Sequence, residues 1–279
     1  MDDVIRRPGL GPVIGSQVRY QLTLMLRTPR TLMAGLILPG ALLALQLGRV
    51  EQAGQGAAAD VLAARVAGLV VLGAMSVAYL SHASSLVVAR EDGVLRRWRA
   101  TPLPSWGYFA GRITATVLLA DAAGLILVLV GMAMAGLRLT EGAIGGLLLA
   151  GTLGALALAA AGTAVTPLLT SAQGANPLLT LTYLPLIIFS GGFGGLSGLP
   201  HWLNTVMSYL PAQPMIDAVT RALQQSAGQS GPILSGRDLA VLAAWALGGL
   251  LLSVRFFRWD PHRPRHARSA GAGNPARSV

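Results

Sequence analysis

Six apolar runs, each about 20 residues long, constrain this chain more than any other feature of its sequence. They span residues 31–48, 62–88, 112–136, 143–168, 176–195 and 239–257. An α-helix rises about 1.5 Å per residue, so about 20 residues cross the roughly 30 Å hydrocarbon core of a bilayer. A helix also satisfies its own backbone hydrogen bonds inside lipid. The sequence therefore predicts an all-α membrane protein with six transmembrane helices.

The composition agrees with a lipid environment. Hydrophobic residues make up 53% of the chain and charged residues 11%, whereas soluble domains carry about 25% charged residues. Because the chain has no cysteine, it can form no disulfide, thiolate metal site or cysteine nucleophile. Its four histidines and scattered carboxylates do not fall at metal-ligand spacing, so we expect no metal site.

All 21 basic residues are arginine, and the net charge is +10. Walker-type phosphate-binding loops and protein kinases both need a lysine beside the nucleotide phosphates. We therefore expect this chain to have no ATPase site and no cofactor of its own. The arginines flank the apolar runs and do not form a basic face on a soluble fold, which argues against a nucleic-acid partner.

The placement of the arginines predicts the topology. They gather before the first run, between the second and third runs, and after the last run: Arg6, Arg7, Arg19, Arg27, Arg30; Arg90, Arg96, Arg97, Arg99, Arg112; Arg255, Arg258, Arg263, Arg265, Arg268, Arg277. Arginine-rich segments stay on the cytoplasmic side, so both termini should be cytoplasmic. A cleaved signal peptide ending near Ala57-Ala58-Ala59 is the alternative for the first run, but about 30 residues precede that run, more than a normal leader has.

The ends of the chain differ from its middle. Before the first run, Ile14, Val18, Leu22 and Met25 recur at helical spacing, which predicts an amphipathic helix in the cytoplasmic interface or, alternatively, a frayed cytoplasmic helix. Residues 261–279 are rich in arginine, proline, glycine and serine without apolar periodicity. We expect one membrane domain over residues 1–260, followed by a disordered basic tail.

The loop after the second run combines charge, a short helical pattern and a proline stop, in the order Arg90-Glu91-Asp92-Gly93-Val94-Leu95-Arg96-Arg97-Trp98-Arg99-Ala100-Thr101-Pro102-Leu103-Pro104. This loop resembles that of the ABC-2 type permeases, the membrane subunits of ATP-driven exporters, in which it ends in Ala-Thr-Pro-Leu. The resemblance implies a coupling helix that docks on a separate ATPase. The residues implied are Arg90, Glu91, Asp92, Gly93, Leu95, Arg96, Arg97, Trp98, Thr101 and Pro102.

A second segment is similar to the same family. It comprises Phe189-Ser190-Gly191, then Leu199-Pro200-His201-Trp202-Leu203, then Pro211-Ala212-Gln213-Pro214-Met215. The resemblance implies a re-entrant helical hairpin on the outer face between spans five and six, with Pro200, Trp202, Pro211 and Pro214 as its marker residues. Gly192-Phe193-Gly194-Gly195 departs from the family's bulky Phe-Phe-Pro at the outer gate.

The family resemblance also implies partners and a location. Two such chains, as a homodimer or a heterodimer, would bind two ATPase subunits that hold ATP and magnesium. The assembly would lie in the bacterial cytoplasmic membrane and export drugs, antibiotics, lipids or lipid-linked polymers. Few charges lie in the apolar runs, which favours a hydrophobic drug-like or lipid-like substrate.

Ionisable residues inside spans are candidates for the translocation path. Asp121 is one, together with Ser190 and Gly191, although a structural contact between helices is equally consistent with an acid there. Arg112 precedes Asp121 by nine residues, about 13 Å along a helix, which disfavours a direct pair. His82 lies near Ser81, Ser84 and Ser85, and we expect it to be a hydrogen-bonded structural group.

Two other functions remain open from the residues alone. Gly195-Leu196-Ser197-Gly198 matches the tetrad of rhomboid-type intramembrane serine proteases. Such a nucleophile needs a histidine base within reach, yet the sixth run has none and His201 lies only four residues after Ser197. A membrane scaffold that transports nothing is the other alternative.

Overall fold

The computed structural model describes residues 10–29, 33–50, 58–99, 105–135, 139–169, 171–189, 200–225, 231–233 and 235–256. These residues form helices joined by turns, and no strand occurs among them. The predicted all-α class is confirmed. The tail at 261–279 lies outside the described residues.

Three apolar helical rods dominate the molecule. The first runs without a break through α4 (Ala58–Met75), the π-helical segment η2 (Ser76–Ser81) and α5 (His82–Glu91). The second is α7 (Ser105–Ala135), and the third is α8 (Glu141–Val165) with the 3₁₀ turn η3 (Thr166–Leu168). Their apolar stretches Leu62–Glu91, Gly107–Ala133 and Glu141–Leu168 are long enough to cross a membrane. They coincide with the predicted spans 62–88, 112–136 and 143–168.

Helices also lie where the other three spans are predicted. They are η1 (Met33–Ile37) with α3 (Leu38–Val50), then α9 (Ala172–Phe189), then α12 (Gly236–Phe256). Among the described residues these helices do not reach the length and apolarity of the three rods. The chain is thus a multi-pass helical protein, and the count of six crossings stays a prediction.

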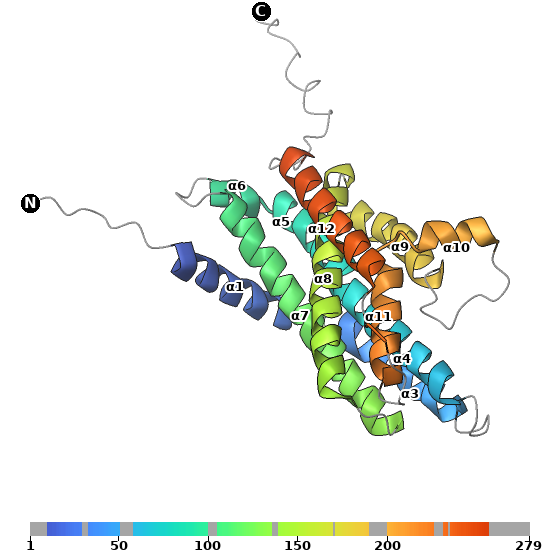
Figure 1. Cartoon of the computed structure of the whole chain (residues 1–279). Helices are drawn as coiled ribbons and strands as arrows, with labels where there is room; N and C mark the ends of the chain where they lie inside the picture. Colours follow the sequence, from blue (N-terminus) through green and yellow to red (C-terminus); the bar gives the residue numbers. More distant parts are fainter. Residues whose placement is uncertain are drawn as a thin grey trace, which may run out of the picture.

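The helices pack around α8 (Figure 1). Helix α12 runs along α8, and α11 (Ala212–Gln225) lies against both α4 and α8. The buried residues of α8 are mostly small: Ala143, Ala150, Gly154, Ala155, Ala157, Ala159, Ala160, Ala161 and Gly162. Small residues let helix backbones approach closely inside a membrane. At Gly249 of α12, an added Cβ would lie 2.7 Å from the carbonyl carbon of Ala160.

Helix α1 (Leu10–Leu26) packs against α7. Of the apolar positions Ile14, Val18, Leu22 and Met25, Met25 is buried and the other three are half-buried. The buried face of α1 is centred on Gln17 and Gln21, which are 7% and 2% exposed. A helix is therefore present where the sequence predicts one before the first span, and its placement in the cytoplasmic interface stays a prediction.

Candidate functional site

A tight turn ends the rod formed by α4, η2 and α5. The amide of Asp92 donates to the carbonyl of Val88 at 2.9 Å, and that of Gly93 donates to the carbonyl of Arg90 at 3.2 Å. Gly93 has a φ of 69°, a left-handed conformation that residues with a Cβ adopt only at a cost. This turn lets α6 (Val94–Arg99) begin immediately and in a new direction.

The two residues before this turn fasten it to neighbouring elements. Arg90 is 1% exposed, and its guanidinium donates to the carbonyls of Thr166, at 3.4 Å, and Leu169. The carboxylate of Glu91 accepts a 2.8 Å hydrogen bond from the amide of Ala172, the first residue of α9. An acidic side chain is favourable at a helix N-terminus. Arg90 and Glu91 therefore position the turn between α5 and α6, because they join the end of α5 to the end of α8 and the start of α9.

Helix α6 is anchored by Leu95, which is fully buried in a small cluster with Leu86 of α5 and Tyr108 of α7. Leu95 therefore forms the buried side of this short helix. Asp92 and Arg97 are exposed, and Arg97 donates to the carbonyl of Asp92 at 3.4 Å. The side chains of Arg96 and Trp98, and the whole of Thr101 and Pro102, lie outside the described residues. The resulting segment has a fixed inner side and a charged outer side.

A cavity of about 610 Å³ opens between α5 and the start of α6 on one side and α1, η2, α7 and α9 on the other. Its wall mixes apolar side chains such as Leu24 and Leu80 with serines of the second span, among them Ser84 and Ser85. Arg112 of α7 also lines it and is 3% exposed. Its guanidinium donates to the hydroxyl of Tyr108 at 2.8 Å and to that of Ser85 at 2.6 Å.

Asp121 lies farther along α7 and contacts a different helix. Its carboxylate accepts a 2.8 Å hydrogen bond from the hydroxyl of Thr152 on α8. This is the structural interhelical contact that the sequence left open, and Arg112 bonds elsewhere, as its spacing predicts. Ser190 and Gly191, the other predicted path residues, lie outside the described residues, as does the protease-like tetrad at 195–198.

His82 is fully buried where three helical rods meet. Its Nδ1 lies 2.8 Å from the hydroxyl of Thr116 on α7, and its Nε2 lies 3.0 Å from that of Thr163 on α8. Both ring nitrogens therefore have partners, as expected for a structural histidine. The nearby Ser76 and Tyr79 of η2 make similar bonds to Tyr183 and Thr182 of α9, each 2.8 Å long; no local spacing indicates these pairs, which are 107 and 103 residues apart.

The segment between α9 and α12 contains two helices, as the predicted hairpin requires. Helix α10 (His201–Met207) follows Pro200 and has no buried side chain, and its Trp202 is 65% exposed. Pro211 and Pro214 are buried at the start of α11. Since α11 lies against α4 and α8, the two helices differ greatly in burial. The re-entrant path and the outer location stay predictions.

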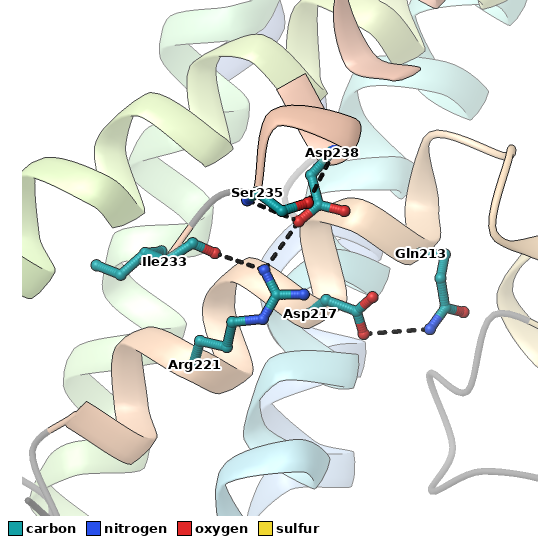
Figure 2. Close-up of polar contacts among 6 residues, drawn as sticks. All are labelled: Gln213, Asp217, Arg221, Ile233, Ser235 and Asp238. Atoms are coloured by element: carbon teal, nitrogen blue, oxygen red, sulfur yellow. Dashed lines mark hydrogen bonds and ion pairs between the residues drawn. The ribbon is translucent and has the colours of Figure 1, made fainter. Parts of the chain in front are cut away.

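The polar face of α11 carries a cluster that the sequence did not single out (Figure 2). Arg221 donates to the carboxylate of Asp238 at 2.8 Å and to the carbonyl of Ile233 at 2.9 Å. Asp217 accepts a 3.2 Å bond from Gln213. Arg221 and Asp238 are 17 residues apart and belong to different helices, so no local spacing indicates their contact.

Comparison with known proteins identifies a family. A family model described as ABC-2 family transporter protein matches residues 48–255, which include all three apolar rods, the turn at Gly93 and α6. A search of curated proteins found no match.

Proposed function

The chain belongs to the ABC-2 family of transporter proteins, and from that premise we propose that it is the permease subunit of an exporter for a hydrophobic, drug-like or lipid-like substrate. Membership makes it a multi-pass membrane permease that works with an ABC-type ATPase. We propose that a separate polypeptide supplies the ATPase site with its ATP and magnesium, because this chain contains no lysine for a phosphate-binding loop.

The observation that carries the proposal is the construction of the α5–α6 turn. Leu95 is buried against α5 and α7, while Asp92 and Arg97 face outward. A partner that binds the outer side would move α6, and Arg90 and Glu91 connect that movement to the end of α8 and the start of α9. With this arrangement, a displacement of α6 on partner binding would be transmitted to several helices at once.

We further propose the cytoplasmic side of a bacterial inner membrane for α6, with both termini on that side. The arginines before the first span, around α6 and after α12 support this orientation. Two permease chains would face each other, and each would bind one ATPase subunit. The largely apolar wall of the cavity behind α6 supports a hydrophobic substrate.

The test is to co-express the chain with candidate ABC-type ATPases and to measure co-purification and ATPase activity. Arg97→Glu is the first variant, because Arg97 is exposed and donates only one long hydrogen bond. Arg255→Glu, at an exposed position in the last turn of α12, is the matched charge reversal away from α6. We expect Arg97→Glu to lose most ATPase binding and Arg255→Glu to retain it.

Asp92→Arg and the double variant Glu91→Arg with Gly93→Pro extend the series. The double variant also breaks the bond from Glu91 to Ala172 and the left-handed turn, so its folding must be checked by gel filtration. An unaltered complex with Arg97→Glu and Asp92→Arg would refute the docking role of α6. If no ATPase binds the wild type, the result would favour the alternative functions, a membrane scaffold or an intramembrane serine protease.

A further inference from the structure

We propose that the cavity behind α6 binds the anionic group, a phosphate or carboxylate, of an amphiphilic molecule. This inference rests on the proposed export function and specifies the substrate class. Its ligand would place the charged group at Arg112 and its apolar body along the remaining wall. The cavity's volume of about 610 Å³ lies within the range of about 300–1,000 Å³ typical of small-molecule sites.

Arg112 brings a positive charge into the wall of the cavity. The side chain is 3% exposed, and its two bonded nitrogens donate to the neutral hydroxyls of Tyr108 and Ser85. Among the described residues no ion pair involves Arg112; its guanidinium lies 5.9 Å from the centroid of the Tyr108 ring, which is neutral. A buried charge without a counter-ion is costly. An anionic ligand would supply the missing charge.

Gln21 of α1 lines the same cavity. It is 2% exposed, and its Oε1 has no hydrogen-bond partner among the described residues. Buried polar groups are normally satisfied, so an amide oxygen without a partner beside a cavity indicates a polar ligand. Rotation about the last torsion exchanges the amide oxygen and nitrogen, which allows the group to donate to an anion.

The wall of the cavity contains both polar and apolar side chains. Ser84 lines the cavity together with Arg112, and its hydroxyl can donate to a phosphate or carboxylate oxygen. The hydroxyl of Ser85 instead donates to the carbonyl of His82 at 2.9 Å and accepts from Arg112. Leu24, Met25 and Leu80 provide an apolar part. Asp92 also lines the cavity, but it is exposed in the turn after α5. A purely apolar drug would leave the guanidinium unmatched, and an inorganic anion would leave the apolar wall unfilled.

The test uses the purified full-length permease in a neutral detergent, without ATPase. Binding of a fluorescent NBD-labelled phosphatidic acid is compared with binding of the matching NBD-diacylglycerol, which lacks the phosphate. We expect Arg112→Gln to weaken phosphatidic acid binding about tenfold to a hundredfold, the usual effect of losing a charge-assisted hydrogen bond, without changing diacylglycerol binding. Arg112→Lys should retain most of the affinity, and Arg255→Gln, the matched loss of an exposed arginine, should retain all of it.

Competition distinguishes the sources of the anion. Displacement of the probe by soluble decyl phosphate would assign the site to anionic amphiphiles from water as well as from the bilayer, whereas displacement only by unlabelled phosphatidic acid would assign it to lipid. Both results support the proposal. Equal displacement by inorganic phosphate would overturn it, as would unchanged binding by Arg112→Gln or an equal loss with Arg255→Gln.

A cavity-filling variant guards against misfolding of Arg112→Gln. Ser84→Phe leaves Arg112 in place and fills the space with a ring, so we expect it to lose binding of both probes while eluting as the wild type does. Wild-type binding by Ser84→Phe would overturn the proposal. The export function is judged separately, because Arg112→Gln should still co-purify with the ATPase; absence of the wild-type complex would count against the proposed function and not against the anion site.

Discussion

Arg221 and Asp238 form an ion pair in which Nη1 and Oδ2 lie 2.8 Å apart, and this pair joins α11 to the first turn of α12. The same carboxylate accepts a 3.0 Å hydrogen bond from the amide of Ser235. Burial acts to raise the pKa of Asp238, but the bonds from Arg221 and Ser235 outweigh it and hold the pKa below its ordinary value of 3.8.

Asp238→Asn should therefore destabilise the protein by about 1–2 kcal/mol at neutral pH, since it removes both a capping carboxylate and the partner of Arg221. Because the pKa of Asp238 is lowered on folding, its contribution is present above pH 3.8 and is lost as pH falls through the folded pKa. Thermal unfolding in detergent from pH 6 to pH 3 measures the loss of this contribution. Asp238→Asn should lose less stability than the wild type over that pH range, because it has no carboxylate to protonate at position 238. An acid profile unchanged by the substitution would contradict the assignment.

Asp217 should behave in the opposite way. Burial raises its pKa, and the nearby charge of Arg221 only partly offsets this. Its contribution to stability is therefore lost as pH rises through the raised pKa. We expect Asp217→Asn to leave the protein as stable at pH 7 or to stabilise it by up to about 1 kcal/mol, because an amide carries no buried charge. Destabilisation equal to that of Asp238→Asn would show that the charge of Asp217 is needed.

Adjacent glycines of α12 provide a packing test with a built-in control. A Cβ at Gly249 would lie 2.7 Å from the backbone of Ala160, whereas a Cβ at Gly248 would meet nothing within 4 Å. Gly249→Ala should thus separate α12 from α8 and destabilise the protein by about 1–3 kcal/mol, as overpacking does. Gly248→Ala should be neutral or stabilising. Thermal unfolding of the two variants in detergent decides, and equal midpoints would contradict the close packing.

His82 should affect folding more than transport. Replacing it with leucine removes the bonds to Thr116 and Thr163 and should cost about 2 kcal/mol. The glutamine amide in His82→Gln can bond one of the two hydroxyls, so this variant should lose less stability than His82→Leu. The measurements are the unfolding midpoint and the ATPase activity per folded complex. A His82→Leu protein that is as stable as wild type but inactive would assign the histidine to the transport cycle.

Much of the fold could be predicted from the sequence because a membrane places strong demands on a chain. The spans at 62–88, 112–136 and 143–168 correspond closely to three apolar helices, since length and hydropathy determine such segments. Leu95 also has an identifiable role, because apolar residues among the arginines of a short helix favour buried neighbours, and Leu95 is fully buried.

Tertiary contacts between polar residues could not be predicted in this way. Arg90 belongs to a charged loop in the sequence, yet its side chain is buried against carbonyls of Thr166 and Leu169. Nothing within the loop specifies those partners, which lie 76 and 79 positions later. Gln17 and Gln21 show the same limit, because their burial against α7 depends on the packing of α1 and not on their own polarity.

The bonds of Arg90 and Glu91 have a mechanical consequence. They join the end of one long rod to the end of α8 and the beginning of α9, so these three helices share a pivot. The rod from Leu62 to Glu91 contains 30 residues, and at about 1.5 Å per residue it is a lever about 45 Å long. A tilt of about 5° at the pivot would sweep its far end through about 4 Å, enough to open or close a passage on the opposite face of the membrane without bending any helix.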